Sequence, residues 1–308
     1  MRNSLRFLTS ADLVTVVFLL LLSALECVFA SRVPGWTQLV AQNLGIAALI
    51  AGLALTVHRR GTSAPAAVRF ARDWYLVPII LYIYTQASSI AFPLHGRDYD
   101  QALIAADRFL FGGDPTVWAF RFAHPALTEL LQLAYSSYYL FFIALIAEFS
   151  RRPDRRAFET GAFLIVYGFY LSYVGYLLVP AVGPRFTLHD FAATDAELPG
   201  LLLTPYLRDI INAGGGAPAG SADPLAAVHR DAFPSGHTQL TLTAMYIAFR
   251  MRSLHRWWLL AVGSLLIVST IYMRYHYGID VLAGVLFFIA AVASGTALDR
   301  WWRRASGR

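Results

Sequence analysis

The chain has no lysine, few charged residues and a single cysteine. Only 14% of its 308 residues are charged, against about 25% in a typical soluble domain. A soluble protein of this length needs far more charge to cover its surface, so the composition argues against one large soluble helical core. With Cys27 alone, no intrachain disulfide can form, and cysteine usage does not indicate a redox compartment.

Apolar runs dominate what is present, since 57% of the residues are hydrophobic. Runs of about 20 residues, the length that crosses a bilayer, recur along the chain. They predict an all-α, polytopic membrane helix bundle with about eight transmembrane helices. The expected spans are roughly Ala11–Ala30, Thr37–Val57, Trp74–Phe92, Ala126–Phe149, Thr160–Val179, Thr238–Phe249, Trp257–Met273 and Ile279–Leu298.

The arginines predict how these spans are oriented. With eight spans, one side of the membrane carries 17 arginines and the other 8, out of 25 in total. The positive-inside rule then puts both termini in the cytoplasm. The net charge of +6 does not indicate nucleic acid binding, which requires a basic patch on a soluble module.

Two long loops, Pro93–Pro125 and Pro180–Pro234, fall on the extracytoplasmic side of this arrangement. Loops of this length in a compact protein usually have a function or cover a site. Asp98, Asp100 and Asp107 have the chemistry of metal ligands, but a solvated loop face is the favoured interpretation. We expect no metal and no cofactor.

Three segments at the extracytoplasmic face carry candidate chemistry: 179–186, 233–238 and 272–284. In the second segment, Ser235 is suited to cap the following helix, and the N–H groups of the first turn, from Gly236 on, favour an anion. His237, in that first turn, would face the same anion. An ordinary helix cap beside an incidental histidine is the alternative.

The third segment places His276 and Asp280 four residues apart, which on a helix is one face. A carboxylate beside an imidazole fixes the tautomer and makes the other nitrogen more basic, as a nucleophilic histidine requires. A tyrosine-rich interfacial belt is the alternative. In the first segment, Arg185 is suited to bind phosphate bidentately, or simply to meet lipid headgroups.

Together the three segments resemble the type 2 phosphatidic acid phosphatase superfamily. Pro234-Ser235-Gly236-His237 matches its second signature, and His276 with Asp280 matches the end of its third. The resemblance implies that His276 attacks phosphorus, that Asp280 orients it and that His237 protonates the leaving oxygen. It also implies phosphate binding by Arg185, Ser235, Gly236 and Arg274, without metal.

The chain departs from the superfamily pattern in two places. The lysine of the first signature is missing, and Gly183-Pro184-Arg185 instead looks like the inositol phosphorylceramide synthase-like branch. The arginine of the third signature would fall at Thr270. Because Arg274 lies four residues further on, we expect the two to share a helix face and Arg274 to replace the missing group.

These observations predict N-terminal transmembrane helices with an extracytoplasmic loop in residues 1–125 and a phosphatidic acid phosphatase-like catalytic core in residues 126–308. The expected function is a membrane lipid phosphatase or phosphotransferase, acting on a phospholipid or a polyprenyl or sphingolipid phosphate at the extracytoplasmic face. A sphingolipid-type headgroup transferase is the first alternative. A transporter or a non-catalytic lipid-binding relative remains a further one. The oligomeric state stays open.

Overall fold

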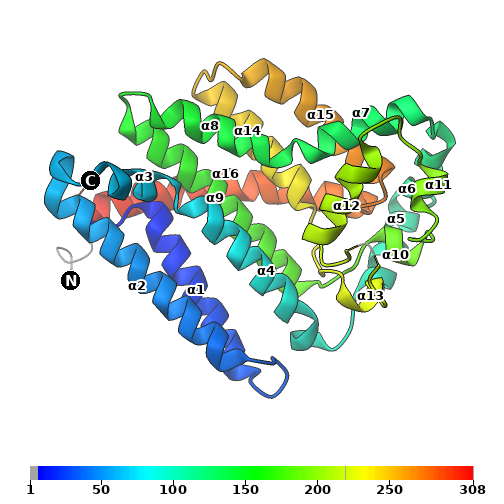
Figure 1. The fold of residues 1–308 in the computed structure, drawn as a ribbon, viewed down its shortest axis with the longest axis horizontal. Helices are drawn as coiled ribbons and strands as arrows, with labels where there is room; N and C mark the ends of the chain where they lie inside the picture. The colour runs from blue at the N-terminus through cyan, green and yellow to red at the C-terminus, as the bar shows by residue number, and fades with distance from the viewer. Residues whose placement is uncertain (1–5, 219, 308) are drawn as a thin grey trace.

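The computed structural model describes residues 6–218 and 220–307, and every regular element in these ranges is a helix. The predicted all-α fold is therefore confirmed (Figure 1). The elements are α1 (Ser10–Val28), α2 (Trp36–Arg60), η1 (Gly61–Ser63), α3 (Ala66–Trp74), α4 (Leu76–His95), α5 (Asp100–Phe111), α6 (Pro115–Ala119), η2 (Phe120–Phe122), α7 (Pro125–Ser136), α8 (Tyr138–Ser150), α9 (Arg155–Leu178), α10 (Pro184–Thr187), α11 (Thr194–Glu197), α12 (Thr204–Gly214), α13 (Pro224–Ala227), α14 (Gly236–Arg250), α15 (Arg256–Tyr272) and α16 (Gly278–Ser306).

The eight predicted spans correspond to helices, but their number is not confirmed. Among the described residues, five helices are long and apolar enough to cross a membrane, namely α1, α2, α4, α9 and α16. The pair α7 and α8, bent by 42°, makes a sixth if it forms one span. The remaining two, α14 and α15, have only 15 and 17 residues. The chain is an integral membrane protein whose structure supports five or six spans.

Helix α9 forms the centre of the bundle and packs against α1, α4, α8, α14 and α16 (Figure 1). The apolar 18-residue stretch of α9 is 72% buried, whereas that of α2 is 17% buried. Glycines let α14 approach it closely: a Cβ atom at Gly168 would lie 3.1 Å from the Leu240 side chain. At Gly175 a Cβ would overlap the ring of Pro234, 2.1 Å away. Small residues at such crossings allow close backbone packing in membranes, and here they fix the start of α14 against α9.

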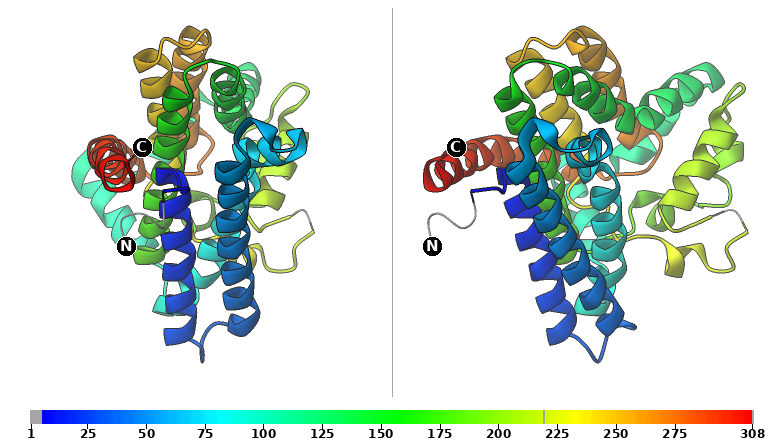
Figure 2. Two further views of the ribbon diagram at one scale, coloured as in Figure 1. Left: turned by 90° about the vertical axis from the view of Figure 1, so that its left-hand side faces the viewer. Right: turned by 60° about the vertical axis from the view of Figure 1, so that its left-hand side comes forward.

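The short helices of the two long loops gather at one end of the molecule. Figure 1 shows α5, α6 and α10–α13 together on the right, whereas the ends of α1 and α16 near the termini lie on the left. Both views of Figure 2 show α1 and α2 running side by side as an antiparallel hairpin. The two long loops and the chain ends are thus at opposite ends of the bundle.

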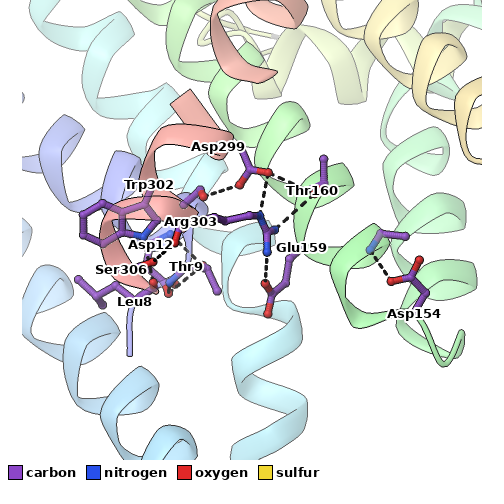
Figure 3. Close-up of polar contacts among 12 residues, drawn as sticks. Leu8, Thr9, Asp12, Asp154, Glu159, Thr160, Asp299, Trp302, Arg303 and Ser306 are labelled. Atoms are coloured by element: carbon purple, nitrogen blue, oxygen red, sulfur yellow. Dashed lines mark hydrogen bonds and ion pairs between the residues drawn. The ribbon is translucent and has the colours of Figure 1, made fainter. Parts of the chain in front are cut away.

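Buried polar contacts join α1, α9 and α16 at the end that carries the termini (Figure 3). Asp299 of α16 accepts hydrogen bonds from Ser10 of α1, Thr160 of α9 and Arg303 of its own helix. The indole N–H of Trp302 donates to the carbonyl of Leu8 at 3.1 Å. These contacts satisfy polar groups that would be costly in an apolar surrounding, and they lie far from the loop end.

Candidate active site

The structure brings the three segments together at the loop end of the bundle. Between the second and third segments, the Ser235 N–H donates to the Asp280 carbonyl at 2.9 Å. Directly before the second segment, the Ala232 N–H donates to the Ala181 carbonyl of the first segment at 3.2 Å. Backbone hydrogen bonds therefore hold the three segments in one cluster, although Ala181 and Asp280 are 99 residues apart in the chain.

The second segment begins α14 as the sequence predicts. Ser235 is the N-cap residue, and its Oγ accepts the N–H of Thr238 at 3.2 Å. Gly236 is required there because a Cβ atom would lie 2.3 Å from the Tyr176 hydroxyl. The N–H groups of a first helical turn have no carbonyl partner within the helix. Those that Ser235 does not cap therefore remain suited to an anion.

His276 has a defined tautomer. Its Nδ1 lies 2.8 Å from the carbonyl oxygen of Ala232, which can only accept a hydrogen bond. Nδ1 must therefore carry a proton, so in the neutral ring Nε2 carries the lone pair. The carboxylate of Asp280 lies further away, with Oδ2 3.5 Å from Nδ1. The backbone carbonyl is the nearer orienting group, and no side-chain pattern could have revealed it.

His276 does not lie on the helix that the four-residue spacing suggested. Helix α16 begins at Gly278, with Tyr277 as its N-cap residue, so only Asp280 is helical. Asp280 is fully buried, and its Oδ2 also accepts the Tyr277 N–H at 2.8 Å. The pair is close because the turn before α16 folds His276 back over the first helical turn.

His237 contacts the free nitrogen of His276. Its Nδ1 lies 3.4 Å from His276 Nε2 and 3.4 Å from the Tyr135 hydroxyl. Two aromatic rings pack on the imidazole: Tyr135 stacks on it with ring centroids 4.5 Å apart, and Tyr138 lies at 4.4 Å. Sequence reasoning missed both tyrosines, which come from the bent pair α7–α8.

Arg185 contacts this cluster through Tyr275. It is 9% exposed, and its Nη1 donates to Asn212 Oδ1 at 2.7 Å. Its guanidinium packs over the ring of Tyr275 at 5.1 Å, and Tyr275 stacks on Tyr135 at 4.4 Å. Because Tyr135 in turn stacks on His237, a layer of aromatic rings connects the guanidinium to the imidazole.

The expected geometry of Arg274 is wrong. Helix α15 ends at Tyr272, and Arg274 follows it with φ +65°, so Arg274 and Thr270 share no helix face. The buried guanidinium forms an ion pair with Glu197 of α11 and packs over Phe120. The left-handed turn before His276 thus directs Arg274 toward α11 and Phe120.

The interpretation of the acidic loop as a solvated face is wrong for two of its three residues. Asp100 and Asp107 are 4% and 1% exposed. Asp107 accepts the N–H groups of Gly278 and Ile279 at the start of α16, at 2.8 and 2.6 Å. Asp100 and Asp107 are seven residues apart, on one face of an amphipathic helix, and this spacing was the signal for their burial that the sequence contained. The side chain of Asp98, by contrast, is 25% exposed, and it forms an ion pair with Arg230.

Burial sets the titration of two groups around the site. It lowers the pKa of His229, a residue of the loop before α14 that contacts the Tyr84 hydroxyl of α4. It raises the pKa of Tyr277, and the neighbouring Asp100 carboxylate raises it further. Both side chains are therefore neutral at neutral pH.

One cavity borders the cluster, and a second lies within the helix bundle. A polar one of about 190 Å³ is lined by Arg185, Tyr275, Asp195, Arg208, Asp209 and Asn212, among others. An apolar one of about 170 Å³ lies between α4, α8 and α9, where its lining includes Tyr139, Phe142 and Phe169. In the part of the chain that the structure describes, no group of three or more His, Cys, Asp or Glu side chains is placed to hold a metal ion.

The buried His276 and the half-buried His237, in contact at one end of a membrane helix bundle beside a helix start and a buried arginine, form a candidate site for phosphoester chemistry. A family model of the PAP2 superfamily matches residues 101–294, more than half of the chain, and the protein belongs to this superfamily. Membership supports a phosphoester-acting enzyme of the lipid phosphatase type. Searches of the curated proteins and of the solved structures gave no significant match.

Proposed function

We propose that the protein cleaves a lipid phosphate through a phosphohistidine formed on His276. The observation that carries this proposal is the 2.8 Å contact between His276 Nδ1 and the Ala232 carbonyl oxygen. With the Nδ1 proton directed at the Ala232 carbonyl, the lone pair of Nε2 faces His237. A nucleophile and an acid are thus paired as two-step phosphoryl transfer requires.

In the first step, Nε2 of His276 attacks phosphorus, and the bond from phosphorus to the leaving oxygen breaks. The proton on His237 moves to that oxygen. In the second step, the oxygen of water or an alcohol attacks phosphorus, the P–Nε2 bond breaks and returns its electron pair to His276, and the proton of the attacking oxygen passes to His237. The N–H groups at the start of α14, with Ser235 and Gly236, stabilise the charge on the phosphoryl oxygens. Arg185 supplies the guanidinium, and Asp280 supports the cationic form of His276.

The arginine distribution supports an extracytoplasmic site with both termini in the cytoplasm. The loop helices and the chain ends lie at opposite ends of the bundle, as this orientation requires. Reporter fusions at Arg308 and in the 214–220 loop are the test. Opposite compartments are expected, and the same compartment for both would contradict the orientation.

The polar cavity beside Arg185 favours headgroup transfer as a second candidate function. Its two arginines are matched by Asp195 and Asp209, so the cavity offers donors and acceptors without a net positive charge. Such a surface suits a neutral, hydroxyl-rich headgroup better than a second phosphate. This is the feature that agrees with the inositol phosphorylceramide synthase-like resemblance.

One experiment separates the candidates. Purified protein in lipid nanodiscs is given a panel of lipid monophosphates and lipid phosphodiesters, with and without a lipid alcohol as acceptor. Free phosphate and new lipid products are measured in the same samples, with His276→Ala as the control. Hydrolysis releases phosphate without an acceptor, whereas transfer yields a new lipid only with one. No product from any substrate would overturn the proposed function.

A further inference from the structure

A single buried carboxylate connects the first and third segments of the site. Asp100 lies at the start of α5, outside the signature segments. Its Oδ1 accepts the N–H of Gly183 at 2.9 Å and the hydroxyl of Tyr277 at 2.7 Å. Its Oδ2 accepts the N–H of Val182 at 3.1 Å. Three donors from two distant parts of the chain thus meet at one side chain.

Each partner of Asp100 lies close in sequence to a residue with a proposed function. Val182 and Gly183 precede Arg185 in the chain, and Thr187 of the same short helix contacts the Tyr277 hydroxyl at 2.6 Å. On the other side, Tyr277 follows His276, and its N–H donates to Asp280. Asp100 is therefore one hydrogen bond away from both the phosphate-binding and the nucleophilic segment.

The first segment has little freedom around this contact. Gly183 has φ +94°, and a Cβ atom there would lie 2.9 Å from the carbonyl oxygen of Tyr275. The two segments are therefore in direct backbone contact at this point. A small displacement of one segment has to be accommodated by the other, since close-packed interiors transmit strain.

Replacing Asp100 with asparagine would leave the donors of one carboxylate oxygen unsatisfied. A buried carboxylate is costly unless it is hydrogen-bonded, and here three donors compensate. Burial raises the pKa of Asp100, and the hydrogen bonds from Tyr277, Gly183 and Val182 oppose that rise. An amide in its place offers one oxygen and adds an N–H that faces another donor.

We propose that Asp100 is a positioning residue that holds the Arg185 guanidinium and the His276 imidazole in register around one phosphoryl group. This inference rests on the proposed function. Asp100 itself touches neither histidine. It acts through Tyr277 and through the backbone of Val182 and Gly183. A misplacement of about 1 Å between reacting groups can cost on the order of 100-fold in rate, so a contact of this kind is sufficient to govern turnover.

The test compares Asp100→Asn and Tyr277→Phe with Asp299→Asn. Asp299 is a matched control because it is also a buried, hydrogen-bonded carboxylate, 5% exposed, but lies at the opposite end of the bundle. Two readouts are measured: kcat and KM on a lipid phosphate that the wild type turns over, and the rise in Tm caused by inorganic vanadate. The second readout requires no lipid turnover.

Asp100→Asn should lower kcat by about 10- to 100-fold and reduce the vanadate-induced rise in Tm. Tyr277→Phe should cause a smaller loss, and the double variant should lose less than the two separate losses combined. Asp299→Asn should lower Tm but keep kcat and the vanadate response. Wild-type kcat and vanadate response in Asp100→Asn, or equal losses in Asp299→Asn, would overturn the inference. If the wild type turns over no lipid phosphate, the proposed function fails, and the vanadate comparison alone decides the role of Asp100.

Discussion

Nδ1 of His237 and Nε2 of His276 lie 3.4 Å apart, in direct contact. A phosphoryl group bonded to Nε2 must occupy the space that the His237 ring now fills. His276 is held through its other nitrogen by the Ala232 carbonyl, whereas His237 is held mainly by ring packing on Tyr135 and Tyr138. We therefore expect His237 to be the ring that moves when substrate binds.

This contact predicts unequal roles for the two histidines. His276→Ala should abolish the covalent intermediate with every substrate, because the nucleophile is gone. His237→Ala should retain the intermediate with a nitrophenyl phosphate, whose leaving group requires little proton donation. Rapid quenching with labelled substrate and peptide mapping is the measurement. Label on a peptide that contains His237 would reverse the assignment, and no label under single-turnover conditions would favour direct attack by water.

Gly236 should not tolerate a methyl group. Gly236→Ala places a Cβ atom 2.3 Å from the Tyr176 hydroxyl, and overpacking of this kind costs about 1–3 kcal/mol of stability. Tyr176→Phe in the same chain should recover part of that loss. Gly45→Ala is the control, since a Cβ atom there meets nothing within 4 Å. Chemical denaturation in detergent is the measurement, and equal stability of the Gly236 and Gly45 variants would contradict the packing argument.

Arg274 should contribute to stability through its ion pair and not replace an arginine at Thr270. Arg274→Ala leaves Glu197 without its partner and should lower Tm. The double variant Arg274→Ala/Thr270→Arg should not restore turnover, because the two positions share no helix face. Steady-state kinetics on both variants are the measurement. Recovery of turnover in the double variant would show that the two arginines reach the same phosphate after all.

His189 should make the protein sensitive to acid. Burial, with the nearby Arg274 guanidinium, lowers the pKa of His189 from 6.5 to about 4, whereas Glu197 and Asp114 oppose that effect. The unfolded chain binds this proton below pH 6.5 and the folded protein does not. Stability from the neutral ring is therefore present above that pH and is lost as pH falls toward 4.

The corresponding variant is His189→Gln, whose amide can still bond to Thr116, the partner of His189 Nε2 at 2.9 Å. Its Tm should fall less than that of the wild type between pH 7 and 4.5. Thermal unfolding of both proteins across this range is the measurement. Parallel curves would show that His189 does not carry the effect.

Several features followed from the sequence because they depend on local chemistry. Apolar runs of bilayer length produced helices at each predicted span. Ser235 caps α14 because a hydroxyl before a helix can satisfy an N–H of its first turn. The pairing of Pro234–His237 with His276 and Asp280 also indicated the family that the model match shows.

Tertiary structure decided the features that depend on contacts between distant residues. A left-handed turn after Tyr272 separates Arg274 from the helix face that its spacing suggested. The orienting partner of His276 is a backbone carbonyl 44 residues away, which carries no side-chain signal. Asp100 is buried because Tyr277 and the backbone of Gly183 fold over it. Local spacing specifies which residues face the same way on one helix, whereas only the packed chain determines which groups satisfy a buried charge.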